Sequence, residues 1–375
     1  MKVQADQVAA FRLARHHFVG PANLSAVCEN VCGIQAQVMS AAQVALWARM
    51  HQLKRDDIQV ALWRDRALVR TSCMRQTLHL LTAKDFPMYI AALRRSRVGA
   101  IWRIMSKFGV TQREADALND DVVEALAAGP LTKRQLTGHI APKVGKHVQA
   151  WMERFWNVFR LAVVEGLICY GPVDGQQDTM VRVDHWLPKQ KRISEQDAQQ
   201  LLLRRYLRAY GPATLQDFAR WAGFPMPEAK AAWTLFQDEL CEVDVEGQKG
   251  FVLREDLGIL KNSASGGHIL RLAPSFDPYL LGHVNKNHLL DPVHYKRVYR
   301  SSAWISPVVL LNGRVAGIWS SQRRGKQVLL EIEPLANFSK SMKALLAVEA
   351  ASLGEFLSLS PVVNFKSEPT RRVVD

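Results

Sequence analysis

Histidine and cysteine are the residue types that most often hold a metal ion, and neither has the spacing that a metal site requires here. His283, His288 and His294 lie five and six residues apart, without accompanying cysteines. The cysteines are odd in number and form no C-x-x-C pair; they are Cys28, Cys32, Cys73, Cys169 and Cys241. The chain has no GxxxxGKS/T phosphate loop and no HExxH motif. We therefore expect no metal and no cofactor.

Binding of a polyanion is the second chemistry that the residue types suggest. Lysine and arginine number 49 against 35 aspartate and glutamate residues, which gives a net charge of +14 and a pI near 9.7. The basic residues form short groups, such as Arg94, Arg95, Arg97 and Arg103 or Arg323, Arg324 and Lys326. Such groups suit a folded groove better than a disordered tail, so nucleic acid is the first partner to consider. Charge alone leaves open a basic protein that binds nothing acidic.

The N-terminus and the cysteine content bear on location. The opening MKVQADQVAAFRLARHHF has no signal-peptide core, and no stretch approaches the roughly 18 apolar residues that span a membrane. An odd cysteine count favours reduced thiols over a disulfide framework. We expect a cytoplasmic, nucleoid-associated monomer that does not bind membranes.

The elements that must position any site begin with helices. Hydrophobic periodicity predicts helices over residues 6–18, 24–32, 41–50 and 56–63. Residues 67–81 are rich in β-branched and apolar types and predict two short strands joined near Met74 to Gln76. Helices followed by a β-hairpin have the element order of a winged helix. A longer helix is expected next, capped by Thr82 with Asp85 completing the capping box, and running to about Lys107.

The order of helices and hairpin recurs twice, although no fixed sequence period is visible. The second occurrence contains a long predicted helix over 148–165 and strand-like segments on both sides of 173–178. The third has helices over 196–209 and 214–223 and two strands within 241–254. These patterns predict further winged-helix units.

Strands dominate the C-terminal part. Residues 307–311, 314–320 and 327–333 predict a meander with a tight turn at Asn312-Gly313, followed by a helix over 339–357 and a last strand. A small barrel and a helix-covered sheet both fit this order. We predict an α+β chain of tandem winged-helix units with a C-terminal β-rich, barrel-like domain, divided as 1–110, 111–192, 193–262 and 263–375.

Five segments in this order resemble the AlkZ/YcaQ-type winged-helix DNA glycosylases. They read GIQAQVMSAAQVALWARM, VRTSCMRQTLHLL, YLRAYGPATLQDFARWAG, LAPSFDPYLLGH and PVVLLNGRVAGIW, and they extend over nearly the whole chain. The resemblance implies tandem winged helices and a β-rich domain around a concave DNA-binding channel. It also implies hydrolysis of the N-glycosidic bond of N7-alkylated, cationic purines, in some members including interstrand crosslinks.

The family's catalytic signature is Gln, one small or apolar residue, then Gln or Asp. Gln35-Ala36-Gln37 matches the Gln-x-Gln, AlkZ-like branch, with alanine where a larger apolar residue is also common. A glutamine amide has no pKa near neutrality and cannot act as a general base, but its carbonyl oxygen can accept a hydrogen bond from water. An alkylated purine that leaves as a neutral base needs little more help. The alternative is a pair of solvated surface glutamines.

The position of the two amides depends on the backbone between them. Side chains two residues apart diverge by about 200° on a helix. We therefore expect Gln35 and Gln37 in the loop or helix end between Cys32 and Ala41, where an extended or turning chain can bring them to one side.

Other residues have less specific candidate roles. Asp277 is expected to cap a turn or to orient a basic side chain, and Trp47 to lie in the core. His79 shares a strand face with Thr77 and either contacts nucleic acid or is a packed, hydrogen-bonded histidine. The candidate DNA contacts, for which solvated faces are the alternative, are Arg70, Arg75, Thr77, His79, Lys133, Arg134, Arg208 and Arg220.

The function expected is that of a monofunctional DNA glycosylase acting on double-stranded DNA with alkylated purines, in repair or self-resistance. No lysine is singled out as a Schiff-base amine, so no β-lyase step is expected. Two alternatives remain open at this stage: a non-enzymatic winged-helix regulator that binds DNA, and a scaffold whose winged helices pair with protein.

Overall fold

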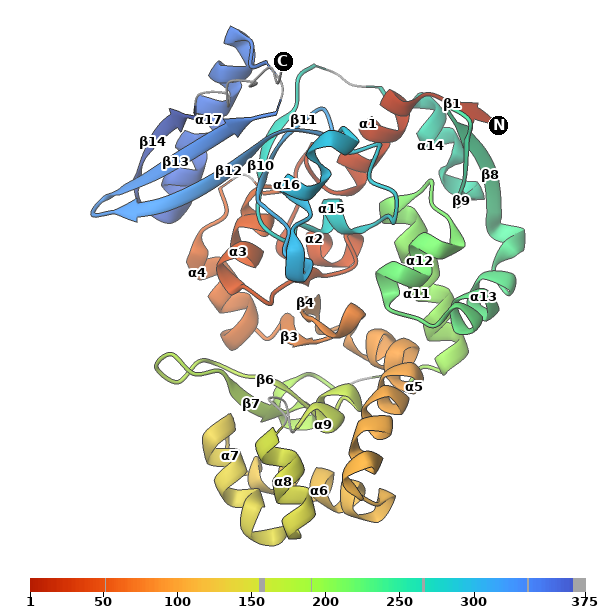
Figure 1. Cartoon of the computed structure of the whole chain (residues 1–375), viewed down its shortest axis with the longest axis vertical. Helices are drawn as coiled ribbons and strands as arrows, with labels where there is room; N and C mark the ends of the chain where they lie inside the picture. The colour runs from red at the N-terminus through yellow and green to blue at the C-terminus, as the bar shows by residue number, and fades with distance from the viewer. Residues whose placement is uncertain (51, 155–158, 190, 265–266, 336, 367–375) are drawn as a thin grey trace, which may run out of the picture. The chain divides into compact units, whose positions relative to one another are not determined.

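The computed structural model describes residues 1–50, 52–154, 159–189, 191–264, 267–335 and 337–366 (Figure 1). The chain forms two compact units. The first unit comprises Met1–Ile58, Arg205–Phe218 and Gln237–Asp375, and the second comprises Gln59–Arg204 and Ala219–Phe236. Each unit combines helices with β-sheet, which agrees with the mixed α+β composition expected from the sequence. Within the described ranges, no helix is both long and apolar enough to cross a membrane.

The first unit begins with three helices at the predicted places. These are α1 (Ala5–Arg15), α2 (Leu24–Asn30) and α3 (Met39–Trp47). The fourth predicted helix starts as α4 (Arg55–Gln59) and continues as a π-helical turn, Val60–Arg64. Periodicity therefore located these helices, and the structure shifts their ends by at most three residues.

A small sheet covers α1. Strand β1 (Lys2–Val3) pairs in parallel with β8 (Leu240–Val245), which forms an antiparallel hairpin with β9 (Gln248–Leu253). Helix α14 (Leu257–Asn262) follows this hairpin. Val8 and Phe11 of α1 pack in one buried cluster with Val243 and Val252. This packing holds α1, and with it Arg12, against a hairpin more than 200 residues away in the chain.

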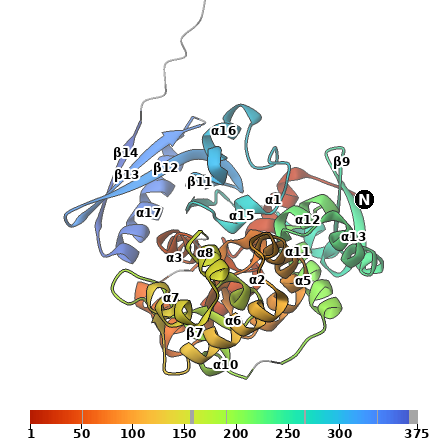
Figure 2. The same ribbon diagram turned by 60° about the horizontal axis from the view of Figure 1, so that its bottom comes forward.

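Strands β10 to β14 form the C-terminal sheet of the first unit. They are β10 (Leu270–Ala273), β11 (Val308–Leu311), β12 (Arg314–Arg324), β13 (Gln327–Pro334) and β14 (Ser360–Phe365), hydrogen-bonded in that order. Helix α17 (Lys340–Leu357) packs against β10, β13 and β14 and lies along one face of the sheet in Figures 1 and 2. The predicted meander and its turn are confirmed, since Asn312 and Gly313 have φ of 49° and 81°.

The barrel-like shape is not found. In the described residues the sheet runs from β10 at one edge to β14 at the other without closing. The helix-covered sheet, which the same element order also allowed, is the arrangement present. Alternating hydrophobicity identifies strands but does not determine whether the edge strands pair with each other.

The middle of the chain ties the first unit together. Helix α11 (Glu195–Tyr210) ends in this unit, and α12 (Leu215–Ala222) begins in it. Tyr206 donates a hydrogen bond to the carbonyl oxygen of Gly282 at 2.7 Å, just after α15 (Pro278–Leu281). Tyr210 donates to the carbonyl oxygen of Val31 at 3.1 Å, just after α2. These two buried hydroxyls join α2, α11 and the C-terminal segment.

In the second unit, helices surround an antiparallel arrangement of β4, β3, β6, β7 and β5, in that order. The strands are β3 (Leu68–Ser72), β4 (Leu78–Thr82), β5 (Leu131–Thr132), β6 (Ile168–Tyr170) and β7 (Thr179–Arg182). The helices are α5 (Phe86–Met105), α6 (Gln112–Ala125), α7 (Lys133–Ile140), α8 (Lys146–Arg154), α9 (Arg160–Val164), α10 (Val183–Trp186) and α13 (Met226–Thr234). The long helix predicted over 148–165 falls partly on residues 155–158, which lie outside the described residues.

Candidate active site

The segment that holds Gln35 and Gln37 is set by the way α2 ends. The amide of Gly33 donates to the carbonyl oxygen of Cys28 at 2.7 Å, and the amide of Cys32 donates to that of Glu29 at 3.2 Å. Cys32 and Gly33 have φ of 61° and 88°. This left-handed pair is a helix C-cap that turns the chain sharply out of the helix. The residues that follow therefore leave α2 in an extended conformation.

Gln35 and Gln37 lie in that extended segment, as the two-residue spacing requires. Strand β2 (Ile34–Gln35) is followed by a bend at Gln37, and α3 starts at Met39. Ile34 and Ala36 are fully buried, Gln35 is 7% exposed and Gln37 is exposed. Burial therefore does not alternate along this segment: Gln35 is buried like its two apolar neighbours, and Gln37, at the bend, is open to solvent.

Helix α3, which starts directly after the glutamines, is anchored at its other end by a buried ion pair. Arg49 donates from Nη1 and Nη2 to both carboxylate oxygens of Asp277, at 2.8 and 2.6 Å, and both side chains are fully buried. Asp277 Oδ1 also accepts from the amide of Tyr279 at 2.9 Å. The expectation that Asp277 caps a turn and orients a basic side chain is confirmed.

Trp47 belongs to the core, as expected. It is 5% exposed, its ring stacks on Phe356 with centroids 6.3 Å apart, and its indole N–H donates to the hydroxyl of Ser352 at 3.2 Å. These contacts fix α3 against α17. Together with the ion pair of Arg49, they hold rigid the helix that follows the glutamines.

The hairpin of the second unit turns two of its candidate residues inward. His79 is 1% exposed, and its ring nitrogens lie 3.0 Å from the Thr77 carbonyl oxygen and 3.4 Å from Arg75 Nη2. Burial, with Arg75 as a smaller cause, lowers the pKa of His79 to about 3, so the ring is neutral. Arg70 is 8% exposed and pairs with Asp178 at 2.6 Å. The packed alternative thus describes His79, and Arg70 has a structural partner.

The connection between the hairpin strands is shaped by close backbone approach. Arg75 and Gln76 have φ of 53° and 64°, and the Arg75 guanidinium donates to the carbonyl oxygen of Trp221. A Cβ on Gly223, whose φ is 81°, would lie 3.0 Å from the Arg75 amide nitrogen. The hairpin tip and the end of α12 therefore pack together, which brings Arg75 next to the residues around Arg220. Thr77 is half-buried and donates to the carbonyl oxygen of Met74 at 3.2 Å.

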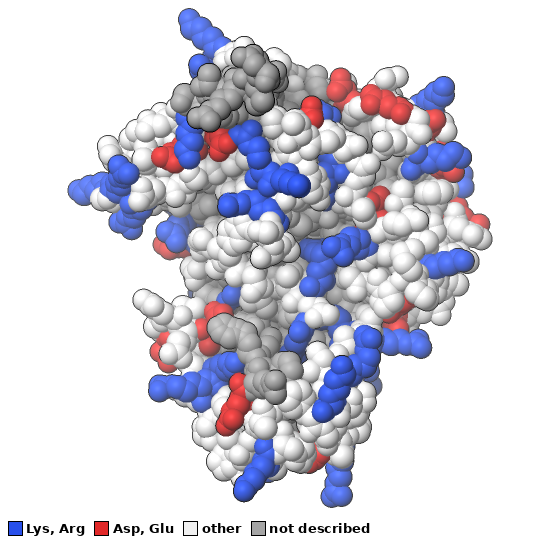
Figure 3. All heavy atoms as spheres, viewed as in Figure 1, with Lys and Arg blue, Asp and Glu red and all other residues white. Residues whose placement is uncertain are grey.

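The remaining candidate cations lie on the surface. Lys133 and Arg134 are exposed in the first turn of α7, and Arg220 is exposed in the last turn of α12. Arg208 is half-buried and pairs with Glu255. In the space-filling view, Lys and Arg side chains are more widespread than acidic ones on the visible face (Figure 3). These positions suit contacts to phosphate, which needs accessible cations.

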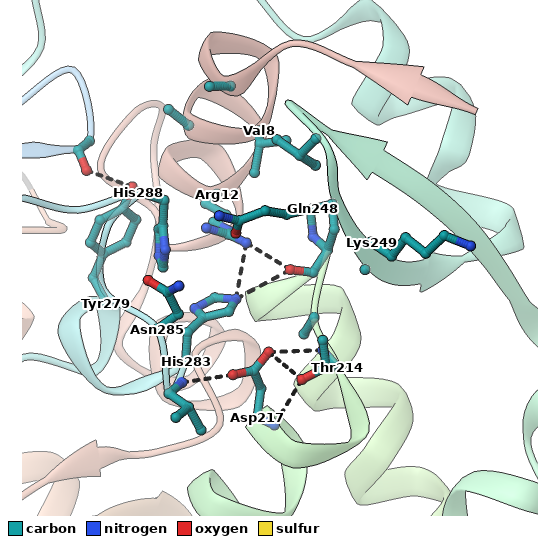
Figure 4. Close-up of a pocket in the computed structure, with 18 of the residues that line it drawn as sticks. Val8, Arg12, Thr214, Asp217, Gln248, Lys249, Tyr279, His283, Asn285 and His288 are labelled. Carbon is teal, nitrogen blue, oxygen red and sulfur yellow. Dashed lines mark hydrogen bonds between the residues drawn. The ribbon is translucent and has the colours of Figure 1, made fainter.

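A pocket in the first unit was not foreseen from the sequence. Its volume is about 420 Å³, and Arg12, Asp217, His283 and His288 are among the residues that line it (Figure 4). Two histidines whose sequence spacing does not suit a metal site, His283 and His288, thus lie side by side in this lining, with ring centroids 4.7 Å apart. No linear motif joins residues so far apart in the chain, so their convergence could be seen only in the fold.

The glutamine segment can position a molecule but cannot ionise it. An amide carbonyl oxygen accepts hydrogen bonds and an amide N–H₂ group donates them, and neither changes charge near neutral pH. A rigid pair of amides is therefore suited to hold water or to place dipoles beside a developing charge.

Comparison with known proteins assigns the chain to a family. The family model described as DNA glycosylase AlkZ-like matches residues 28–356. The chain is 35% identical over 339 residues to the interstrand DNA cross-link repair glycosylase of Streptomyces sahachiroi, covering 85% of this chain and 88% of that protein. It is also similar to the solved structure of Streptomyces sahachiroi DNA glycosylase AlkZ, with a TM-score of 0.83 and 29% identity, over 98% of this chain and 100% of that one. The chain thus belongs to the AlkZ-like family of DNA glycosylases and is an enzyme rather than a regulator or a scaffold.

Proposed function

We propose that this glycosylase hydrolyses the N-glycosidic bond of N7-alkylated, positively charged purines and that Gln35 and Gln37 are its catalytic residues. The observation that supports the proposal is the place of the two amides, two residues apart in the segment between α2 and α3, with Gln35 buried and Gln37 open to solvent. Two amides this close in the chain can hold a single water molecule between two acceptors.

The chemistry matches a substrate that is already activated. Hydrolysis passes through a transition state with positive charge on the sugar, and a catalyst helps by placing the water and by aiming dipoles at that charge. The Gln35 and Gln37 carbonyl oxygens accept hydrogen bonds from the attacking water. A cationic purine departs as a neutral base and needs no strong acid, whereas an unmodified purine would need one.

Crosslinked DNA is a further proposed substrate. A relative 35% identical to this chain is described as an interstrand DNA cross-link repair glycosylase. A purine that is crosslinked through N7 carries the same positive charge as a singly alkylated one. We propose that the same two amides release it, so that one strand is unhooked in repair or self-resistance.

The DNA-binding framework is proposed to consist of winged-helix units. Three times along the chain, helices precede an antiparallel strand pair: β3–β4, β6–β7 and β8–β9. The division at 1–110, 111–192, 193–262 and 263–375 stays a prediction. Among the candidate DNA contacts, the exposed Lys133, Arg134 and Arg220 and the less exposed Arg75, Thr77 and Arg208 are retained. The burial of Arg70 and His79 favours structural roles for them.

The test is release of free base from duplexes with N7-methylguanine or an N7 crosslink, compared with an unmodified duplex. Gln35→Ala and Gln37→Ala are each expected to slow release by about 10²- to 10³-fold, the usual cost of losing one group positioned for the transition state. DNA affinity should stay nearly intact. Gln37→Asp should keep part of the activity, because a carboxylate accepts the same hydrogen bond from water.

Gln43→Ala is the matched control. Gln43 is 7% exposed, as Gln35 is, and lies on the helix that follows the motif. Its loss should leave the rate of release nearly unchanged. Equal loss of affinity and rate in the Gln35 and Gln37 variants would assign these residues to positioning or folding. Absence of base release from both damaged duplexes would refute the proposed substrates.

A further inference from the structure

The pocket of about 420 Å³ contains an arginine whose charge meets no acidic partner at contact distance among the residues that the structure describes. Arg12 is 7% exposed and lines the pocket. Its Nε donates to the Gly211 carbonyl oxygen at 3.2 Å, and its Nη2 donates to that of Pro212 at 2.8 Å. Within the described structure, its third nitrogen, Nη1, has no hydrogen-bond partner, yet it is not sealed from solvent.

The other groups around Arg12 do not neutralise it. Burial lowers the pKa of Arg12, and Asp217 opposes this only as one of the smaller causes. The oxygens of Asp217 accept from the Thr214 amide and hydroxyl and from the Val284 amide, at 2.7 to 2.9 Å. His283 Nε2 lies 3.0 Å from Arg12 Nη2 and 2.9 Å from the Tyr210 carbonyl oxygen, so according to its tautomer the ring accepts from the arginine or donates to the carbonyl. Burial, then Arg12, lowers the pKa of His283 well below 6.5, which keeps it uncharged.

A buried cation without a contacting carboxylate is unfavourable unless a bound anion compensates its charge. The pocket offers further donors toward such an anion. Asn285 uses its Oδ1 to accept from the Asn287 amide at 2.8 Å, which leaves its N–H₂ group available, and Gln248 is exposed at the rim. Arg314 is also exposed there and donates to the His288 carbonyl oxygen at 3.2 Å.

The size and lining of the pocket indicate more than a bare ion. A volume of 420 Å³ falls in the range of small-molecule sites, which is roughly 300 to 1,000 Å³. Val8, Ala9 and Val245 supply apolar walls beside the polar groups. Figure 4 shows Arg12, His283, Asn285 and His288 around one space, with Asp217 turned to Thr214.

We propose that this pocket, the Arg12 pocket, binds the phosphate group of a nucleotide, with Arg12 and Asn285 as donors to the phosphate oxygens. Arginine suits phosphate because its guanidinium stays charged and its N–H groups form strong charge-assisted hydrogen bonds. The phosphate can come from a free nucleotide or from the DNA backbone. The proposal does not depend on the roles of Gln35 and Gln37.

Titration of the full chain with deoxythymidine 5′-monophosphate, followed by calorimetry, tests the free-nucleotide source. Uncharged thymidine serves as the ligand control. Asn285→Asp keeps the acceptor for the Asn287 amide and adds a negative charge that repels phosphate. It should raise the Kd at least about tenfold, the equivalent of one charge-assisted hydrogen bond. Asn287→Asp makes the same change of net charge outside the pocket lining and should bind as the unchanged protein does.

Duplex DNA affinity measured over a range of salt concentrations tests the backbone source. If a DNA phosphate occupies the pocket, Asn285→Asp weakens binding about tenfold relative to Asn287→Asp and reduces the salt slope by about one. Gln248→Glu, at an exposed rim position, repeats both tests if Asn285→Asp does not fold. Saturable nucleotide binding lost in the pocket variants supports the first source, and a selective loss of DNA affinity supports the second. If neither is seen, or if the Asn287→Asp control behaves like the pocket variants, the proposal is overturned.

Discussion

Two arginines of the first unit are buried to a similar degree in different surroundings. Arg49 is 2% exposed and Arg12 is 7% exposed. Arg49 meets a carboxylate, Asp277, through two hydrogen bonds and lies over the Phe18 ring at 4.2 Å. Arg12 meets two backbone carbonyl oxygens and a neutral histidine, beside an open pocket. The first environment supplies a carboxylate from within the chain, although Arg49 Nε is buried without a hydrogen-bond partner in the described residues, and the second has room for an anion from outside.

The difference shows what burial of a charge can indicate. A bidentate buried ion pair anchors structure, and here it holds the end of α3 whose other end follows Gln35 and Gln37. A buried charge with a solvent-accessible N–H group beside a cavity suggests binding instead. Exposure alone does not separate the two cases. The identity of the partner atoms does.

Removal of the carboxylate from the complete pair should give the largest effect on stability. Asp277→Ala leaves the Arg49 charge buried without its partner, which is expected to cost about 3–5 kcal/mol of the free energy of unfolding. Urea or guanidinium unfolding of the full chain measures it.

The chain contains a close control for that variant. Asp291 also precedes a proline and accepts from the amide two residues on, at 2.9 Å, but it forms no ion pair with an arginine in the described structure. Asp291→Ala should therefore lose only the cap, about 1 kcal/mol. Equal losses in the two variants would mean that the pair with Arg49 adds nothing, and the contrast between the two arginines would fail.

Local sequence patterns were enough to predict the helices around Arg49 and the structural role of Asp277. Hydrophobic periodicity located α1, α2 and α3, and the Asn312-Gly313 turn located a hairpin, because these signals are local. A position directly before a proline suggested that Asp277 caps a turn or orients a basic residue. Its partner, Arg49, is 228 residues away, and no local signal identifies it.

The Arg12 pocket could not be predicted from local patterns. Nothing local in the sequence distinguishes Arg12, Asp217 or His283. The pocket forms where α1, the start of α12, the β8–β9 hairpin and the segment after α15 converge. The glutamine pair was found through resemblance to a family, since two amides have no distinctive pattern of their own. Closure of the C-terminal sheet was mispredicted because it depends on long-range pairing of edges.

Acid should lower the stability of the protein through the two histidines that line the Arg12 pocket, His283 and His288. Burial, then Arg12, Lys286 and Arg314, lowers the pKa of His288 well below 6.5, and its ring lies 4.7 Å from that of His283. The unfolded chain therefore binds more protons than the folded one below that pH, and stability falls as the pH falls. The expected slope is up to about 1.4 kcal/mol per pH unit for each such histidine.

His288→Gln removes one group that takes up a proton on unfolding. Between about pH 6.5 and 5, the slope of the free energy of unfolding against pH should therefore decrease by the contribution of one proton. Unfolding midpoints measured across that range report the slope. His268→Gln, at an exposed position in the same unit, is the control and should change the slope less. Identical slopes in the unchanged protein and in His288→Gln would show that His288 is protonated in the folded protein as readily as in the unfolded chain. The pocket would then tolerate a positive charge on this ring, contrary to the expectation from its burial.

Replacement of Arg12 itself should cost less than the loss of Asp277. Arg12→Met keeps an unbranched apolar stem and removes the charge, so no unpaired ion stays behind. The loss expected is about 1–2 kcal/mol, because the Gly211 and Pro212 carbonyl oxygens each lose a donor. The same unfolding measurement places this value beside that of Asp277→Ala. A cost as large as that of Asp277→Ala would mean that Arg12 is already neutralised within the chain. A smaller cost means that the chain retains this buried cation for a reason other than its own stability, as a binding site requires.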